Sequence, residues 1–320
     1  MKMRFPIPPS FIIMKYLVTG GAGFIASHLA DALLQEGHQV AVIDNLSTGK
    51  KENVNKKAVF YQADILDAGI CDIFKKEKPD VVFHYAAQID VRKSVNEPVE
   101  SAKTNILGSV NILENCKNFR VKKVVFASSG GAVYGDASVI PTPEDYPAKP
   151  VSPYGIEKLT VEHYLDFYKK EYGLDYLILR LANVYGPRQN SKGEAGVIAI
   201  FCAKLIGRGQ PIINGDGKQT RDFVFVKDVV RASVLGMQKN KSGVFNIGTG
   251  VQTNINDIFR KLKGLFNVEI KEIHAPQKQG EQKRSCLDIA KAKTELEWEP
   301  ECDLNKGLKE TGEWFKNHGF

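Results

Sequence analysis

The sequence predicts an α/β fold of the Rossmann type, a doubly wound parallel sheet followed by a smaller C-terminal α/β subdomain. Three observations support this prediction. Short apolar strands alternate with helical stretches up to about residue 181, a glycine cluster follows the first strand directly, and the alternation becomes irregular beyond about residue 190. Strands that alternate with helices pair in parallel through right-handed crossovers. We therefore expect one domain over residues 14–185, to which later segments return, and a second over residues 186–320.

Each expected strand of the first domain is an apolar run, and each expected helix places apolar residues three or four apart. The strands are expected at 16–18, 39–43, 59–61, 79–84, 123–127 and 176–181. The helices are expected from residue 24 to a stop at Gly37, at 67–76, at 99–116, and from Pro153 onward with Ser152 as the capping residue. In the second domain we expect a helix near 195–207, a turn at 214–217, and strands at 221–226 and 268–273.

Composition and charge argue against several classes of protein. Of the 320 residues, 43% are hydrophobic and 25% are charged, and the net charge of +7 is spread without a long run of one sign. There is no basic stripe with interleaved aromatic residues, so we expect no nucleic-acid partner. No apolar run approaches the ~18 residues of a membrane span. The five cysteines are widely spaced and form no C-x-x-C motif or Cys/His cluster, which predicts reduced thiols, no metal site and a cytoplasmic location.

Residues 1–13 stand apart from the predicted fold. The basic residues Lys2 and Arg4 are followed by three prolines before residue 10, and these prolines interrupt what would be the apolar region of a signal peptide. We expect either a disordered extension or a start codon assigned too far upstream, with Met14 as the true first residue. Of the two we favour the second.

The glycine cluster has the spacing Gly20-x-x-Gly23-x-x-Ala26. Backbone N–H groups at the start of a helix bind phosphate, and glycines permit the tight turn and the close approach of backbone to a pyrophosphate. The spacing alone also suits an ordinary turn in a βα unit. The second strand, however, ends on Asp44, about 20 residues farther on, where a carboxylate binds ribose hydroxyls and repels a 2′-phosphate. The sequence therefore favours NAD over NADP as cofactor.

Tyr154 and Lys158 lie four residues apart on one predicted helix and so share a face. An ammonium group beside a phenol favours the phenolate, and each unit of pKa is worth about 1.4 kcal/mol. A tyrosine tuned in this way accepts a proton from a sugar hydroxyl while the same carbon is oxidised. By itself such a pair also occurs on ordinary protein surfaces.

Seven motifs then occur in order along the chain. They are Gly20-x-x-Gly23-x-x-Ala26, residues 44–49 (DNLSTG), 84–88 (HYAAQ), Ser128-Ser129, Tyr154-x-x-x-Lys158, 183–188 (NVYGPR) and 221–223 (RDF). By these motifs the chain from Met14 onward resembles the extended short-chain dehydrogenases/reductases, and within them the NAD-dependent UDP-glucose (UDP-galactose) 4-epimerases. The resemblance implies reversible epimerisation at C4 of a UDP-hexose, through a transient 4-keto sugar and bound NAD.

The resemblance also implies site residues. For the cofactor these are Gly20, Gly23, Phe24 and Ile25 at the pyrophosphate, Asp44, Asn45, Ser47, Thr48 and Gly49 around the adenosine ribose, Asp64 and Ile65 at the adenine, and Ala86, Ala87, Tyr154 and Lys158 at the nicotinamide. For the substrate they are Ser128, Ser129, Asn183, Arg221, Arg284 and Ser285, with the two arginines at the UDP pyrophosphate. The implied catalytic residues are Tyr154, Lys158 and Ser129. Family members usually pair through the helices equivalent to 99–116 and 153–171, so a homodimer is expected.

One position departs from the family pattern. The family has Ser or Thr four residues before the tyrosine of its V-Y-G segment, where this chain has Gly130. We expect a bulge at the Gly130-Gly131 pair that lets Ser129 reach the sugar. Related 4,6-dehydratases need an acid pair, and decarboxylases a Glu, just before this segment. Gly131 and Ala132 stand there, which counts against both reactions.

The preferred sugar is less well defined by the sequence. Ser285 is expected beside C2 of the hexose, where a small side chain leaves room for an N-acetyl group. The N-acetylated pair is thus a possible substrate beside UDP-glucose and UDP-galactose. UDP-glucuronate is an alternative, as is another NAD-dependent modification of a nucleotide sugar. The alternative outside enzymes is a regulatory protein that binds NAD.

Overall fold

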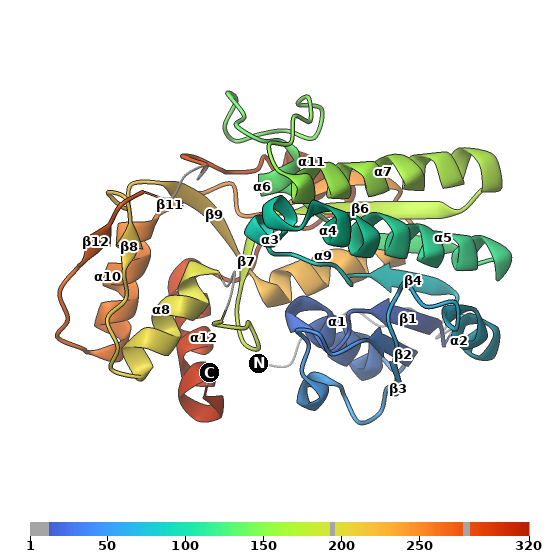
Figure 1. Cartoon of the computed structure of the whole chain (residues 1–320), viewed down its shortest axis with the longest axis horizontal. Helices are drawn as coiled ribbons and strands as arrows, with labels where there is room; N and C mark the ends of the chain where they lie inside the picture. The colour runs from blue at the N-terminus through green and yellow to red at the C-terminus, as the bar shows by residue number, and fades with distance from the viewer. Residues whose placement is uncertain (1–12, 193–195, 278–281, 320) are drawn as a thin grey trace.

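The computed structural model describes residues 13–192, 196–277 and 282–319. Six strands between residues 15 and 181, joined by β10, form a seven-stranded parallel sheet with the order β10-β6-β5-β4-β1-β2-β3 (Figure 1). Its strands are β1 (Lys15–Thr19), β2 (Gln39–Asp44), β3 (Val59–Gln62), β4 (Val81–His84), β5 (Lys123–Ser129), β6 (Asp175–Leu181) and β10 (Gly243–Ile247). The strand order reverses at β1 and β4, and in such sheets ligands bind beyond the carboxyl ends of the strands at this point. Apart from residue 13, the expected extension lies outside the described residues.

Helices cover both faces of this sheet, since successive side chains of a strand point to opposite faces. On β1, Tyr16 and Val18 pack with α1 (Phe24–Gln35), α9 (Val226–Gln238) and residues of α11 (Ala290–Glu295). Leu17 faces the other way and packs with α2 (Ile70–Glu77), α5 (Gly108–Asn118) and α7 (Pro153–Tyr172). Full burial of one such aliphatic side chain contributes about 1.5–3 kcal/mol. Segments beyond residue 185 also pack here, because β10 is an edge strand of the large sheet and α9 and α11 cover one of its faces.

The smaller part of the chain packs around a third apolar cluster, to which α8 (Val197–Ile206), α10 (Ile255–Phe266) and α12 (Leu304–His318) contribute. Its three-stranded sheet has the order β11-β9-β7, formed by β11 (Gln252–Asn254), β9 (Thr220–Phe225) and β7 (Asn183–Tyr185). Two residues of β8 (Ile213–Asn214) pair with β12 (His274–Ala275). In Figure 1 these elements lie on one side of the large sheet, beyond its carboxyl edge.

Three elements expected from the sequence differ in the structure: the strand at 268–273, the helix from residue 67 and the helix at 99–116. Residues 268–273 form no strand; Val268 and Ile270 instead pack on the third cluster, and only His274–Ala275 finds a partner strand. The second helix starts at Ile70 rather than residue 67, because Asp67 closes a turn by accepting a hydrogen bond from the backbone of Asp64 at 3.0 Å.

The expected helix at 99–116 is broken into three pieces. They are α4 (Pro98–Ala102), a π-helical turn η2 (Lys103–Leu107) and α5. The remaining short elements are α3 (Val91–Asn96), α6 (Gly130–Val133) and the single turn η1 (Lys51–Asn53). A π-helical turn such as η2 is wider than an α-helical turn and frequently occurs at functional sites.

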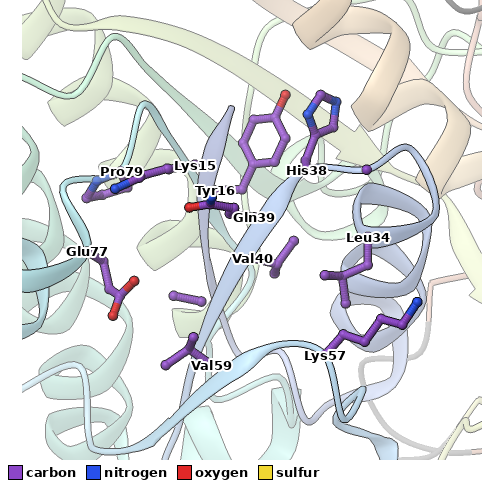
Figure 2. A pocket seen from close by; sticks show the side chains of 12 residues that line it. Lys15, Tyr16, Leu34, His38, Gln39, Val40, Lys57, Val59, Glu77 and Pro79 are labelled. Carbon is purple, nitrogen blue, oxygen red and sulfur yellow. The ribbon is translucent and has the colours of Figure 1, made fainter. Parts of the chain in front are cut away.

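A hollow of about 370 Å³ lies at the amino ends of β1 and β2, next to Lys15, Tyr16, His38 and Gln39 (Figure 2). It is at the opposite end of the strands from Gly20 and Asp44, so it lies away from the ligand-binding edge. None of the helices in the described ranges is both long enough and apolar enough to cross a bilayer.

Candidate active site

The glycine turn between β1 and α1 is shaped to admit a dinucleotide. Gly20 has φ +72°, and a Cβ there would lie 2.8 Å from the backbone nitrogen of Ala86. Gly23 precedes α1, and in the described part of the chain no side chain caps this end of the helix. A Cβ on Gly23 would lie 3.0 Å from the carbonyl oxygen of Gly20. The first N–H groups of α1 are thus left without a side-chain acceptor, in a turn that no larger residue fits, which suits a pyrophosphate.

Asp44 closes this turn from the end of β2. Its Oδ2 accepts a hydrogen bond from Ala22 N at 3.0 Å and its Oδ1 one from Leu46 N at 2.8 Å. A Cβ on Gly49 would lie 2.9 Å from both the Ala22 Cβ and the Asp44 Oδ1, so the loop with Ser47 and Thr48 folds tightly over the glycine turn. The carboxylate is 8% exposed and lies where the ribose of a bound dinucleotide is expected.

Asn45 and Asp64, from the ends of β2 and β3, are joined by a hydrogen bond of 2.7 Å from the Asn45 amide to Asp64 Oδ2. Ile65 follows Asp64 and is buried in the cluster beneath. The structure thus brings together the residues that the resemblance assigns to the adenosine half.

Ala86 and Ala87 follow β4, across the turn from Gly20. The Thr19 hydroxyl accepts hydrogen bonds from the backbone nitrogens of Tyr85 and Ala86, both at 3.2 Å, and contacts His84 Nδ1 at 2.7 Å. Burial, aided by the charge of Lys158, lowers the pKa of His84 to about 3. A neutral imidazole therefore fixes the start of this loop.

The predicted catalytic pair, Tyr154 and Lys158, lies at the start of α7. Ser152 caps the helix by accepting a hydrogen bond from Gly155 N at 3.2 Å, as expected. The Ser129 hydroxyl lies close enough to the Tyr154 hydroxyl to lower its pKa as a hydrogen-bond donor. The Lys158 ammonium donates to the Ala127 carbonyl at 2.8 Å and lies 5.8 Å from the centre of the Tyr154 ring. One phenol, one hydroxyl and one ammonium thus converge at the ends of β5 and α7.

The electrostatics of this pair differ from the sequence-based expectation. Burial, and then the charge of Glu157, raise the pKa of Tyr154, and only the bond to Ser129 opposes them. Burial lowers the pKa of Lys158 to about 8, against the opposing charges of Glu157 and Glu162. The expected lowering of the phenol pKa by Lys158 is therefore not found in the protein alone, because desolvation of the phenolate outweighs it.

Ser129 reaches Tyr154 without the expected bulge. β5 runs to Ser129, and Gly130 begins the single turn α6, which the Ser129 hydroxyl caps at Ala132 N (3.3 Å). Since neighbouring residues of a strand point to opposite faces, Ser128 turns away. Its hydroxyl donates to Glu162 at 2.5 Å and is buried, so Ser128 does not face Tyr154.

The residues expected at the substrate come from three segments. Asn183 begins β7 and is exposed, and Arg221 lies on β9. Arg284 forms a bridge with Thr220, next to Arg221, and Ser285 N donates to the Thr220 carbonyl at 3.2 Å. A Cβ on Gly131 would lie 3.6 Å from the Ser285 hydroxyl, so Ser285 borders the turn that carries Ser129.

Comparison with known proteins gives the same picture. Residues 16–248 match the model of the NAD dependent epimerase/dehydratase family. The chain belongs to this family. A putative UDP-glucose 4-epimerase of Methanocaldococcus jannaschii is 47% identical over 94% of this chain and 98% of its own.

Two solved structures of the family are also similar over nearly their whole length. The UDP-glucose 4-epimerase of Thermotoga maritima, solved with UDP-glucose, is 49% identical with a TM-score of 0.94 over 95% of this chain and 99% of that chain. A UDP-N-acetylglucosamine 4-epimerase of Methanobrevibacter ruminantium is 37% identical with a TM-score of 0.91 over 96% and 99% of the two chains. The resemblance, the fold class and NAD as cofactor are thereby confirmed, whereas the role of each site residue stays a prediction.

Sequence reasoning missed two buried carboxylates of this family member. Asp222, next to Arg221, accepts hydrogen bonds from the backbone and hydroxyl of Thr249 (2.7 and 2.6 Å) and from Gly250 N (3.1 Å). Glu162 pairs at 2.6 Å with Arg180 of β6 and accepts a hydrogen bond from Ser128 of β5. In the sequence, Asp222 is marked only by its place within the motif 221–223, and Glu162 only by its place just after Lys158. Their partners could not be predicted because they are distant in sequence.

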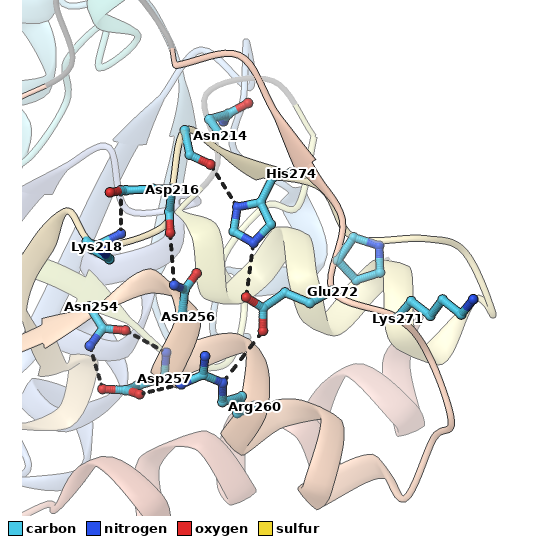
Figure 3. A network of polar contacts seen from close by, with 12 residues as sticks. Asn214, Asp216, Lys218, Asn254, Asn256, Asp257, Arg260, Lys271, Glu272 and His274 are labelled. Carbon is cyan, nitrogen blue, oxygen red and sulfur yellow. Dashed lines mark hydrogen bonds and ion pairs between the residues drawn. The ribbon is translucent and has the colours of Figure 1, made fainter.

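A polar network holds the turn at 214–217 near β8 (Figure 3). His274 Nδ1 contacts the Gly215 carbonyl at 2.7 Å and its Nε2 contacts Glu272 at 3.0 Å, which together raise the pKa of His274. Asn256 donates to the Asp216 carbonyl at 2.9 Å. The network ties β12 and α10 to the loop that leads into β9 and Arg221.

Proposed function

We infer that this enzyme interconverts UDP-glucose and UDP-galactose by reversible epimerisation at C4. The observation that carries the inference is the convergence of Tyr154, Ser129 and Lys158 at the end of β5, on the same carboxyl edge of the parallel sheet as the glycine turn after β1. The similarity to UDP-glucose 4-epimerases over at least 94% of the chain supports the substrate class.

In this proposal the Tyr154 oxygen takes the proton from the 4-hydroxyl of the sugar and later returns it. The Ser129 hydroxyl, bonded to the same phenol, orients it and passes its hydrogen bond to the sugar oxygen. NAD, when bound, supplies the oxidant that accepts a hydride from C4 and gives it back to the other face. Lys158 supplies positive charge that stabilises the Tyr154 phenolate, the form that takes the proton.

The same proposal assigns the binding residues. Gly20, Gly23 and Asp44 would hold the pyrophosphate and ribose of NAD, whose fit to this turn is described above. Arg221 and Arg284 would hold the UDP pyrophosphate while the 4-keto sugar turns over, because a guanidinium binds two phosphate oxygens at once.

The direct test is turnover without added cofactor. Purified protein given UDP-glucose alone should form UDP-galactose to equilibrium, since the oxidant is regenerated in each cycle, and the nucleotide that copurifies should be NAD by mass. Stoichiometric NADH would indicate a net dehydrogenase instead. No product with any UDP-hexose or with UDP-glucuronate, from protein that holds NAD, would leave a regulatory NAD-binding protein.

We also propose that the N-acetylated pair is a substrate, because Ser285 is small where it borders α6. Replacing Ser285 with tyrosine should lower kcat/KM for UDP-N-acetylglucosamine at least about tenfold and leave UDP-glucose within a few-fold, since one steric group in a pocket is worth about 1–3 kcal/mol. Turnover of both substrates by both variants measures this. Equal losses on the two substrates would argue against Ser285 beside C2.

We propose further that the protein is a cytoplasmic homodimer. Exposed apolar side chains line α4, η2 and α7, and they are Val99, Leu107, Ile156, Tyr164 and Phe167. Apolar patches of this kind commonly mark interfaces, and two-fold pairing would join two such helix pairs as a four-helix bundle. Sedimentation should give about twice the chain mass, and Phe167→Asp should shift the species toward the monomer. A monomeric wild type at micromolar concentration would refute the dimer.

A further inference from the structure

A buried carboxylate lies one residue before Lys158 on α7. Glu157 is 3% exposed. Its Oε2 accepts hydrogen bonds from the Ser101 hydroxyl at 2.8 Å and from the Asn105 amide at 2.6 Å. Among the described residues its Oε1 is buried and has no hydrogen-bond partner. Because buried polar atoms are nearly always satisfied, a carboxylate left half-satisfied beside a catalytic lysine indicates a functional role.

The partners of Glu157 connect the catalytic helix with the loop after β4. Asn105 lies on the π-helical turn η2, and its amide group bonds both backbone groups of Gln88, at 2.8 Å each. Gln88 directly follows Ala86 and Ala87. A single side chain, Asn105, thus holds the nicotinamide-side loop and the Glu157 carboxylate together, which explains why the helix is widened at this point.

The charge of Glu157 acts on both members of the catalytic pair. It raises the pKa of Tyr154 and opposes the fall that burial causes in the pKa of Lys158. Glu162 acts on Lys158 in the same direction, but its carboxylate is already paired with Arg180 at 2.6 Å.

The other titratable groups near Glu157 carry little or balanced charge. His84 of β4, whose pKa is low, stays neutral. Ser101 of α4 and Asn105 of η2 are uncharged. Two exposed ion pairs lie on the surface at α3 and α4. Lys93 pairs with Glu97, and Lys103 pairs with Glu100, so the charges within each pair balance. Among the described hydrogen bonds and ion pairs, Glu157 therefore has no cationic partner of its own, whereas Glu162 has Arg180.

We propose that Glu157 is a positioning residue of the active site, whose buried carboxylate keeps Lys158 charged and fixes α7 against the loop after β4. Lys158 is desolvated and donates to a carbonyl oxygen, so without a nearby negative charge its ammonium form is disfavoured. The charge of Glu157 preserves that form, which the phenolate of Tyr154 needs beside it. This role rests on the proposed epimerase function.

The test is the variant Glu157→Gln, which keeps an oxygen acceptor for Ser101 and Asn105 and removes the charge. Both limbs of the kcat profile against pH should move to lower pH by about one unit, because the pKa values of Tyr154 and Lys158 both fall. KM for UDP-glucose should change little. Glu100→Gln, which alters an exposed carboxylate on α4, is the matched control and should leave the profile in place.

A second readout needs no turnover. The tyrosinate absorbance near 295 nm, taken as the difference from Tyr154→Phe, should titrate at lower pH in Glu157→Gln than in wild type. A wild type without turnover would refute the proposed function and leave this titration intact.

Glu157→Met replaces the side chain with an uncharged one of similar length. It should move the kcat profile and the tyrosinate titration to lower pH as Glu157→Gln does, and it serves as a second variant if Glu157→Gln does not fold. Unchanged pH dependence in either folded variant would overturn the proposal. Failure of both to fold would make Glu157 a structural residue and overturn it as well.

Discussion

Tyr154→Phe is expected to lower kcat by about 10²–10⁴-fold, the usual contribution of a positioned general base and acid. The phenol oxygen is bonded to Ser129, and its ring lies beneath the Lys158 ammonium, so the substitution removes the proton acceptor and leaves the packing nearly unchanged. Steady-state turnover of UDP-glucose, together with calorimetric binding of UDP, separates the two effects. The Kd for UDP should stay within about twofold.

The matched control for this experiment is Tyr172→Phe, which removes an exposed hydroxyl from the same helix and should leave kcat unchanged. Substantial turnover by Tyr154→Phe would remove Tyr154 from the mechanism. Loss of UDP binding with the loss of turnover would instead show that Tyr154 acts in binding.

Arg180→Leu is expected to lower the free energy of unfolding by about 3–5 kcal/mol, because it leaves the Glu162 carboxylate buried without a cation. The two side chains are only 8% and 5% exposed and are joined at 2.6 Å, and Glu162 also accepts a hydrogen bond from the Ser128 hydroxyl. Urea unfolding measures the change, provided that the slope of the free energy of unfolding against urea concentration is the same in the variant and the wild type. Lys170→Ala, which removes a surface pair with Asp166, is the control and should cost less than about 1 kcal/mol.

The double variant Arg180→Leu with Glu162→Leu makes this prediction sharper. An apolar pair avoids the uncompensated charge, so it should recover part of the stability lost by Arg180→Leu alone. The alternative result is that the stability lost by the double variant equals the sum of the losses of Arg180→Leu and Glu162→Leu. The ion pair would then contribute nothing beyond its separate side chains.

The strands of the large sheet could be predicted because their apolar runs are local. β1, β2 and β5 each fall within two residues of the expected positions, and Ser152 caps α7 as its sequence indicates. The strand expected at 268–273 could not be excluded from sequence, since Val268 and Ile270 are apolar for packing on the third cluster rather than for pairing. The π-helical turn was equally hidden, because the bonds of Asn105 to Gln88 are made across 17 residues.

The candidate site shows the same limit. The motifs identified the glycine turn and Tyr154, since their chemistry is local. They could not show that Ser129 reaches the phenol without a bulge, because that depends on where β5 ends. Nor could they show the raised pKa of Tyr154, which burial in the folded chain produces. The roles of Asp222 and Glu157 likewise depend on partners that only the fold brings near.

The polypeptide passes repeatedly between its two lobes. It leaves the large sheet after β6, returns in α9 and β10, leaves again at β11, and returns once more in α11 before α12 ends in the small lobe. A fragment cut after residue 185 would lack the edge strand β10 and the covering helices α9 and α11, and β6 would offer bare backbone to other chains. The lobes are therefore expected to melt together in a single cooperative step, and neither is a transplantable module.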